Sequence, residues 1–273
     1  MKKFLLFGAS IIFVLVLSAW SMPSSHHHKH PQPTPTITPK PTNTPTSTPT
    51  IIPISGTSFQ YQLTGSVVLN GASWYDIDGF DNSASTVASI HAAGAKAICY
   101  VDGGTWENWR SDASQFPSSV QGAGNGWPGE KWLDIRQISA LLPIMTARTD
   151  ICKSKGFDAI EWDNVDGYTN STGFPLTSGQ QLVYNKALAD IAHKDNLLAI
   201  QKNDLEQADQ LVSSFDALLL EQCEQYGECS SAQPYIDVNK PVWDVEYSGT
   251  CKPFSGIVVI HKHLALDSRI QAC

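Results

Sequence analysis

Short apolar runs alternate with segments of helical spacing along the chain from about residue 55 onward. Runs rich in β-branched and aromatic residues predict strands, and they lie within residues 73–78, 96–101, 132–135, 157–168, 197–201, 215–221, 241–246 and 257–261. Apolar residues three and four positions apart predict helices over residues 86–93, 138–155 and 182–193. Eight strands separated by helical or crossover-length segments predict an α/β fold, a (β/α)8 barrel of the TIM type. An open doubly wound sheet is the alternative, but the Gly-rich phosphate loop that often marks one is missing.

The pattern changes at the N-terminus. Residues 1–21 combine Lys2 and Lys3, an apolar run over 4–19 and a small-x-small site ending at Ser21, which is typical of a secretory signal peptide. A retained membrane anchor is the alternative, but the run is short for a spanning helix and lacks a charged stop. We therefore expect a secreted protein, extracellular or at the cell surface, without stable membrane insertion after signal cleavage.

Residues 22–54 are rich in Pro, Thr and Ser and show no apolar periodicity. Such a segment cannot bury enough surface to fold, so we interpret it as an extended linker. The histidines of residues 26–30 could bind a transition metal, but we interpret them as part of a solvated tract. Residues 55–273 then form a single barrel-sized domain, which we expect to be a monomer.

The composition narrows the class of partner. The formal net charge is −8 and the sequence pI is ≈ 5.4, which argues against nucleic acid because its recognition needs a basic surface. A neutral or cationic partner fits better.

Six cysteines follow the linker, and no CxxC motif is present. In an exported protein this pattern favours disulfides over a metal site. Cys223 and Cys229 flank a short loop, so we predict that they pair. The sequence leaves the connectivity of the other four open, and the pairing that we favour is Cys99–Cys152 and Cys251–Cys273.

Polar residues gather where the predicted strands end, and in a parallel barrel these ends meet at the face that carries the chemistry. They are Asp78, Asp102, Asp163, Gln201, Lys202, Asn203, Glu221 and Glu246. Any one strand-end acid could instead form a salt bridge or cap a helix, but their convergence favours an active site. Glu221 follows three leucines, and burial would raise the pKa of such a carboxyl toward use as a general acid.

One strand end is especially acidic. Glu161, Asp163 and Asp166 fall within six residues, so they need a cation, a shared proton or a catalytic task unless solvent separates them. A solvated acidic loop is the alternative. Trp162 and Tyr168 lie among these acids, and aromatic rings beside carboxylates are typical of a sugar site.

Five motifs resemble glycoside hydrolase family 114, the endo-α-1,4-polygalactosaminidases. They are residues 75–81 (YDIDGFD), 99–100 with 102–107 (CY, DGGTWE), 156–168 (GFDAIEWDNVDGY), 202–204 (KND) and 221–223 (EQC) with Tyr226 and Cys229. The resemblance runs from about Tyr61 to Tyr247. It implies a (β/α)8 barrel that cleaves α-1,4-linked galactosamine polymers within the chain. Trp162 departs from the family pattern, where Pro is expected in many members.

The resemblance also implies roles for single residues. The catalytic Asp and Glu of the family match Asp163 and Glu221, and we expect a retaining mechanism with Asp163 as nucleophile and Glu221 as acid/base. The residues expected to bind substrate are Asp78, Tyr100, Asp102, Trp106, Asp166, Lys202, Tyr226 and Glu246. We expect a cationic or amino-sugar polysaccharide as the partner, without a cofactor or a metal.

Three other functions stay open on the sequence. One is a non-catalytic, surface-tethered barrel that binds polysaccharide, and the presence of both candidate carboxyls argues against it. Another is an exported glycosidase of different specificity. A polysaccharide deacetylase would need a metal set of His and Asp that the sequence does not supply, and we interpret His261 and His263 as packed or solvated.

Overall fold

The structure is a computed structural model and describes residues 58–249 and 252–273. The predicted signal peptide (1–21) and linker (22–54) lie outside the described residues.

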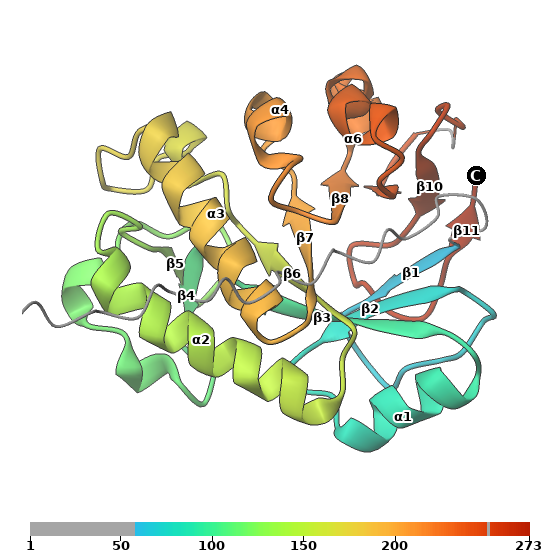
Figure 1. Ribbon diagram of the computed structural model, residues 1–273, viewed down its shortest axis with the longest axis horizontal. Helices are drawn as coiled ribbons and strands as arrows, with labels where there is room; N and C mark the ends of the chain where they lie inside the picture. The colour runs from blue at the N-terminus through green and yellow to red at the C-terminus, as the bar shows by residue number, and fades with distance from the viewer. Residues whose placement is uncertain (1–57, 250–251) are drawn as a thin grey trace, which may run out of the picture. The chain divides into compact units, whose positions relative to one another are not determined.

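Eight parallel strands form a nearly closed barrel with helices around it, which confirms the predicted TIM-like α/β fold (Figure 1). In the order of the sheet they are β1 Phe59–Gln62, β2 Trp74–Asp78, β3 Lys96–Asp102, β6 Ala159–Asp163, β7 Leu198–Lys202, β8 Ala217–Glu221, β9 Val242–Glu246 and β10 Val258–His261. The short β11, Gln271–Ala272, pairs antiparallel with β10. Lys262, directly after β10, donates a hydrogen bond of 2.9 Å to Gln60 of β1. This bond links the first and the last of the eight parallel strands.

One predicted strand is wrong and another was missed. Residues 132–135 are not part of the barrel: Trp132 ends β5 (Glu130–Trp132), which pairs antiparallel with β4 (Thr105–Glu107) in a separate two-stranded sheet. The missed strand is β1, with the sequence FQYQ. Its glutamines, Gln60 and Gln62, are buried through side-chain hydrogen bonds, so the strand lacks an apolar run.

The three predicted helices correspond to α1, α2 and α3, and the short helices α4, α5 and α6 were not predicted. They are α1 Ala84–Ala92, α2 Ile138–Lys155, α3 Ser178–Lys194, α4 Ala208–Leu211, α5 Cys223–Tyr226 and α6 Gln233–Asp237, with 3₁₀ turns at Ala113–Gln115, Ser118–Val120, Gly167–Thr169, Leu205–Gln207 and Cys229–Ala232. The helix α3 starts four residues before its predicted first residue because Thr177 and Gln180 form a capping box. Within the two described ranges, no helix combines the length and apolar character that a membrane span requires.

The core has two layers, because successive strand residues point to opposite faces of the sheet. Outward side chains such as Ile160 and Trp162 pack against the helices, whereas inward ones such as Phe59, Trp74 and Trp243 fill the barrel. Toward the carboxyl ends the inward positions become polar. The barrel therefore has an apolar floor and a charged mouth.

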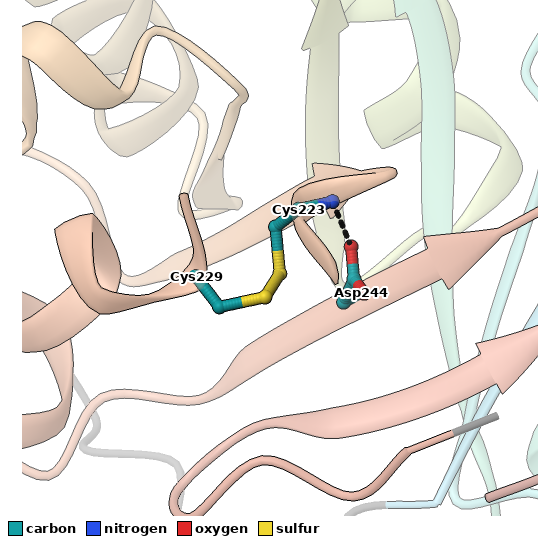
Figure 2. Close-up of side chains that lie close together, drawn as sticks. All are labelled: Cys223, Cys229 and Asp244. Atoms are coloured by element: carbon teal, nitrogen blue, oxygen red, sulfur yellow. Dashed lines mark hydrogen bonds between the residues drawn. A yellow bond between two sulfur atoms is a disulfide. The ribbon is translucent and has the colours of Figure 1, made fainter. Parts of the chain in front are cut away.

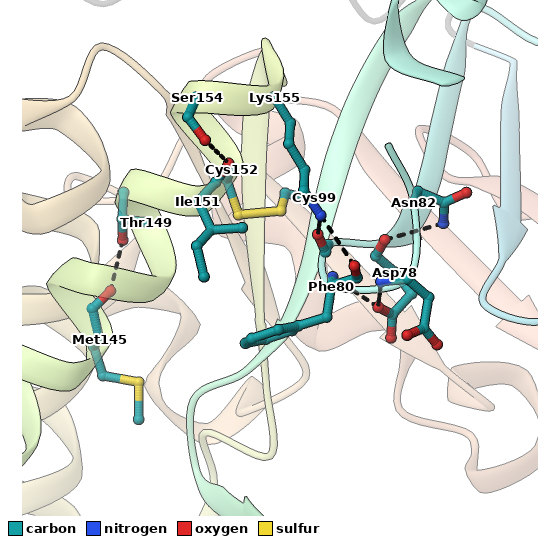
Figure 3. Close-up of a disulfide and its surroundings, with 12 residues drawn as sticks. Asp78, Phe80, Asn82, Cys99, Met145, Thr149, Ile151, Cys152, Ser154 and Lys155 are labelled. Atoms are coloured by element: carbon teal, nitrogen blue, oxygen red, sulfur yellow. Dashed lines mark hydrogen bonds between the residues drawn. A yellow bond between two sulfur atoms is a disulfide. The ribbon is translucent and has the colours of Figure 1, made fainter. Parts of the chain in front are cut away.

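Two of the predicted disulfides are confirmed. Cys99 of β3 is bonded to Cys152 of α2 (Figure 3), and Cys223 is bonded to Cys229. Because Cys251 lies outside the described residues, the third predicted pair is not described. Near the first bridge, the Lys155 ammonium donates hydrogen bonds to the Gly79 and Phe80 carbonyls (2.7 and 3.0 Å), which holds the turn after β2 against α2.

Candidate active site

Three adjacent strands end in charged side chains that meet inside the barrel mouth. Asp163 ends β6, Lys202 ends β7 and Glu221 ends β8. The Lys202 ammonium lies 3.0 Å from Asp163 Oδ1 and 3.2 Å from Glu221 Oε2. The two carboxyls that the sequence singled out therefore share one cation.

Lys202 is buried and has more acceptors than it has protons. Besides Asp163 and Glu221, its nitrogen contacts Glu161 Oε1 at 2.8 Å and the Tyr61 hydroxyl at 3.1 Å. An ammonium offers three N–H donors, and geometry assigns them to Glu161, Asp163 and Tyr61. Burial alone would lower the pKa of Lys202, but the charges of Asp163, Glu161 and Glu221 outweigh it and raise that pKa well above its usual value, so the cation is permanent.

Asp163 is held as an anion by its neighbours. The Tyr100 hydroxyl donates to Oδ2 at 2.7 Å, and the Asn164 backbone N–H donates to Oδ1 at 2.9 Å. Burial would raise the pKa of Asp163, but the Lys202 charge and these hydrogen bonds together lower it. A permanently ionised carboxylate at this position suits a nucleophile.

Glu221 is positioned differently. Its side chain is 24% exposed, so the burial of the preceding leucines does not extend to its carboxyl. The Tyr247 hydroxyl donates to Glu221 Oε1, and the Glu221 backbone N–H donates to Asn203 Oδ1 at 2.9 Å. Because Lys202 directs its three hydrogen bonds to Glu161, Asp163 and Tyr61, Glu221 contacts the ammonium as an ion pair without a hydrogen bond from it.

The backbone is unusual at the ends of β6, β7 and β8. Asn164 (φ 59), Asn203 (φ 45) and Gln222 (φ 63) directly follow Asp163, Lys202 and Glu221 in the left-handed region. Such conformations cost free energy and cluster at functional sites. The approach is also close at Gly104, where an added Cβ would lie 1.7 Å from the Asn164 carbonyl oxygen, so only glycine fits there.

Two further carboxyls, those of Asp76 and Glu161, lie deeper in the barrel than Asp163 and Glu221. Asp76 of β2 is fully buried near Glu161 inside the barrel. Burial, followed by the charge of Glu161, raises the pKa of Asp76 well above its usual value. Burial also raises the pKa of Glu161 to about 7, against the opposing charge of Lys202. The floor of the site can therefore store a proton near neutral pH.

Asp163, Lys202 and Glu221 open into one cavity of about 640 Å³. Six of the predicted site residues line it: Asp78, Tyr100, Asp163, Asp166, Lys202 and Glu221. Trp109 (52% exposed) and Trp127 (63% exposed) line it as well. Burial, together with the charge of Asp163, raises the pKa of Asp166 to about 6. The cavity thus combines carboxyls with exposed aromatic rings, as a site for carbohydrate requires.

The other four predicted substrate-binding residues do not line the cavity. Asp102 is buried and accepts hydrogen bonds from the Gly104 and Thr105 backbone and from Asn164. Trp106 donates to the Ala113 carbonyl at 3.0 Å. Glu246 faces the outside of the barrel, where it accepts the Glu224 N–H at 2.7 Å, and Tyr226 is 64% exposed on α5.

The structure adds residues that the sequence reasoning missed. Tyr61 and Tyr247 contact the central charges, and Arg110, Trp109 and Trp127 line the cavity. Tyr61 was missed together with its strand, whereas Tyr247 directly follows a predicted strand and could have been found from that position. The other three belong to the long loop between β4 and β5, where residue order gives no signal of proximity.

Arg110 neutralises one wall of the cavity. Its guanidinium forms a bidentate pair with Asp78 (3.0 and 2.7 Å) and also donates to Glu107 at 2.8 Å. Asp78 is therefore already paired. The carboxyls of the cavity that remain available to a ligand are those around Lys202, Asp166 and Asp81.

One group has the composition of a metal site, but its chemistry does not fit. Cys223, Cys229 and Asp244 bring ligand atoms within 4.8 Å of one another, the only such trio in residues 58–249 and 252–273. The two sulfurs form a disulfide, as Figure 2 shows, so neither is a thiolate. Burial and the charge of Glu246 raise the pKa of Asp244 to about 8, and its Oδ1 accepts the Cys223 N–H at 3.2 Å. The trio is a structural contact.

The chain is similar to known proteins. The model of the glycoside hydrolase family GH114 matches residues 38–273. The crystal structure of Aspergillus fumigatus Ega3 in complex with galactosamine is 32% identical, with 82% of this chain and 97% of that chain covered and a TM-score of 0.77. The glycoside hydrolase domain of Pseudomonas aeruginosa PelA is 13% identical over 80% of this chain and 98% of its own, with a TM-score of 0.60, and supports the fold alone. A search of the curated proteins finds no match.

Proposed function

The chain belongs to glycoside hydrolase family 114 and is a glycoside hydrolase, and on that premise we propose that it is a secreted, endo-acting enzyme that cleaves α-1,4-linked, galactosamine-containing polysaccharide. The observation that carries the proposal is the placement of Asp163 and Glu221 on one buried lysine within a single cavity. Two carboxyls that flank a glycosidic bond are the minimal machinery for its hydrolysis.

We assign Asp163 as the nucleophile and Glu221 as the acid/base. Glu221 would give its proton to the glycosidic oxygen while Asp163 attacks the anomeric carbon, so that the bond to the leaving sugar breaks as the glycosyl-enzyme ester forms. The deprotonated Glu221 would then take a proton from water, which attacks the same carbon and releases Asp163.

The spacing of the two carboxyls supports retention. Asp163 Oδ1 and Glu221 Oε2 contact the same nitrogen at 3.0 and 3.2 Å, so the distance between them cannot exceed the sum of these values. That limit refers to the two facing oxygens, and it favours the about 5–5.5 Å separation of carboxyl groups in retaining enzymes over the about 6.5–9.5 Å separation in inverting ones. The measurement that tests this assignment is NMR of the first product formed, which should keep the α-anomeric configuration.

Charge supports an amino-sugar substrate. The cavity is lined by seven carboxyls, Asp78, Asp81, Glu107, Glu130, Asp163, Asp166 and Glu221, against the two cations Arg110 and Lys202. An acidic cleft attracts a cationic chain. Ega3, to which this chain is 32% identical, was solved in complex with galactosamine.

Cleavage of one α-1,4-linked galactosamine polymer at graded N-acetylation and at two salt concentrations tests the substrate. We expect mass spectrometry to show internal cleavage products, with faster cleavage of the chain that carries free amines and a weaker preference at high salt, because salt screens exposed charges. Fastest cleavage of the fully acetylated chain without a salt effect would refute the electrostatic basis. Binding without cleavage would point to a non-catalytic barrel, and cleavage of neutral polysaccharide alone to another specificity.

Secretion is supported by the signal-like residues 1–21 and by the two described disulfides, because such bonds persist in oxidising compartments. N-terminal sequencing of the protein from the culture medium should find a start directly after Ser21. A full-length chain retained in the cell would contradict this part of the proposal.

A further inference from the structure

A second hollow lies beside the active-site cavity. Its volume is about 630 Å³, and its walls are the segment after β1 and the first turns of α1. It is lined by Gly65, Ser66, Val67, Leu69, Asp81, Asn82, Ser85, Thr86 and Ser89. We refer to this hollow as the α1 groove.

The α1 groove continues the active-site cavity along two walls. On one wall, Leu63 and Thr64 line the cavity, and the next residues, Gly65 and Ser66, line the groove. On the other wall, Asp81 lines both hollows. A polymer that leaves the catalytic carboxyls in this direction therefore meets the groove without a break in the wall.

The lining of the α1 groove suits a sugar chain. Ser85 and Ser89 lie one turn apart on α1 and are exposed. The Ser89 hydroxyl donates to the Ser85 carbonyl at 2.9 Å and the Ser85 hydroxyl shares a hydrogen bond of 2.7 Å with that of Ser83, so both oxygens keep a lone pair that can accept a hydrogen bond from a ligand. Asn82 is fixed by its hydrogen bond to the Asp78 carbonyl (3.0 Å). Leu69, which is 43% exposed, adds an apolar contact of the kind that carbohydrate sites combine with a few polar groups.

Asp81 adds the charge. Its carboxylate is exposed. Its charge acts on Lys155, but that ammonium donates its hydrogen bonds to the Gly79 and Phe80 carbonyls, and within 58–249 and 252–273 the Asp81 carboxylate forms no salt bridge. Asp78, three residues earlier, is by contrast neutralised by Arg110. At the junction of the two hollows an unpaired carboxylate is placed to accept an ammonium group.

We propose that the α1 groove is a remote subsite that binds the polysaccharide chain away from the cleaved bond, with Asp81 pairing with the ammonium of one galactosamine unit. The inference rests on the proposed function, since it takes the same substrate. It adds that long chains bind better than short ones and identifies the residues that make the difference.

The test compares long and short substrates. The full-length enzyme and its variants would be assayed on a galactosamine polymer and on an oligosaccharide too short to reach the groove, and the ratio of the two kcat/KM values recorded. Asp81→Asn should lower this ratio about two- to fivefold, the value of one exposed ion pair. Ser85→Trp, which fills the groove from an exposed helix position, should lower it by at least as much.

Asp150→Asn is the matched control, because Asp150 is an exposed aspartate of α2 that lines neither hollow. It should leave the ratio at the wild-type value, and all three variants should unfold at the wild-type temperature.

The outcomes separate the two proposals. If the wild type cleaves the polymer but Asp81→Asn and Ser85→Trp keep the wild-type ratio, the groove is not a subsite and the proposed function stands. If the wild type cleaves no galactosamine polymer at all, the proposed function fails and this inference fails with it. An equal loss of ratio in Asp150→Asn would show a general charge effect and overturn the role of Asp81.

Discussion

Two buried ionic networks lie at the mouth of the same barrel, and they differ in their balance of charge. The first has one cation, Lys202, against Glu161, Asp163 and Glu221. The second has two cations, Arg110 and Arg148, against Asp78, Glu107 and Asp112. Burial raises the pKa of Glu107 to about 7 although both arginines oppose this, so the second network is close to neutral.

The second network has the geometry of a brace. Arg148 of α2 is fully buried and forms a bidentate pair with Asp112 at 2.7 and 3.0 Å. It also donates to the Asp102 carbonyl at 2.7 Å and lies over the rings of Phe80 and Phe116. It therefore ties the long loop and the end of β3 to α2.

The charges of the first network do not balance. Three carboxyls face one ammonium, so the network has an excess of negative charge, and Asp163 and Glu221 face the cavity. A proton or a cationic ligand must compensate this excess charge. An acid at the end of a strand is common to both networks. The comparison shows that unbalanced charge next to a cavity is what distinguishes the active site from the brace.

The largest effect should come from removing a carboxyl of the first network. Asp163→Asn and Glu221→Gln should each lower kcat by at least about 100-fold, since a positioned acid or base contributes this much or more, while thermal unfolding stays near the wild type. Asp112→Asn is the matched control, because it replaces a carboxylate of the second network by an amide. It should reduce the free energy of unfolding and leave kcat at the wild-type value. Wild-type rates in Asp163→Asn or Glu221→Gln would remove that residue from the mechanism.

The next largest effect concerns the brace itself. Arg148→Met should lower the free energy of unfolding by about 3–5 kcal/mol, because it leaves buried carboxyls without their cation. Urea unfolding with the disulfides intact measures this. Arg148→Lys should restore only part of the loss, since an ammonium cannot reproduce the bidentate pair with Asp112. A loss of less than about 1 kcal/mol in Arg148→Met would mean that the network is dispensable.

The sequence was sufficient to predict the barrel because most of its strands are apolar on both faces, as buried parallel strands are. The exceptions have physical causes. The β1 strand buries its glutamines through hydrogen bonds, whereas Leu133 and Ile135 are buried as part of a loop. Apolar periodicity reports burial, and it does not report which sheet a segment joins.

The same limit applies to the site. Asp163 and Glu221 were predicted as strand-end acids and do lie together, but Glu246 ends its strand on the outer face, because the inward residues of β9 are Trp243 and Val245. When both faces of a strand are apolar, the pattern cannot tell which residues point inward. The brace residues Arg110 and Arg148 were not predicted, because they meet Asp78 and Asp112 only once the long loop has folded.

A third effect concerns the response of the first network to pH. An unfolded Glu loses its proton near 4.5, whereas folded Glu161 keeps its proton up to about 7. Between these values the folded state binds more protons, so the free energy of unfolding should fall as pH rises, by an amount on the order of 3 kcal/mol. The contribution is fully present below the lower pKa and is lost above the upper one.

Glu161→Gln should remove this part of the pH dependence, as measured by urea unfolding at pH values across the window. The wild type, unfolded in the same series, is the reference for the slope. An unchanged slope in Glu161→Gln would mean that Glu161 is ionised throughout, and that the floor of the site stores no proton.

The smallest effect tests whether burial, and not the number of ion pairs, makes the brace. Lys153 lies on the same helix as Arg148 and also pairs with an aspartate, Asp195, at 2.9 Å. The Lys153 side chain is 49% exposed, whereas that of Arg148 is 0% exposed. Solvent and salt screen an exposed pair, so Lys153→Met should change the free energy of unfolding by about 0–1 kcal/mol. Urea unfolding of Lys153→Met and Arg148→Met side by side tests this. If both variants lose the same free energy of unfolding, the stability depends on the number of ion pairs and not on their burial.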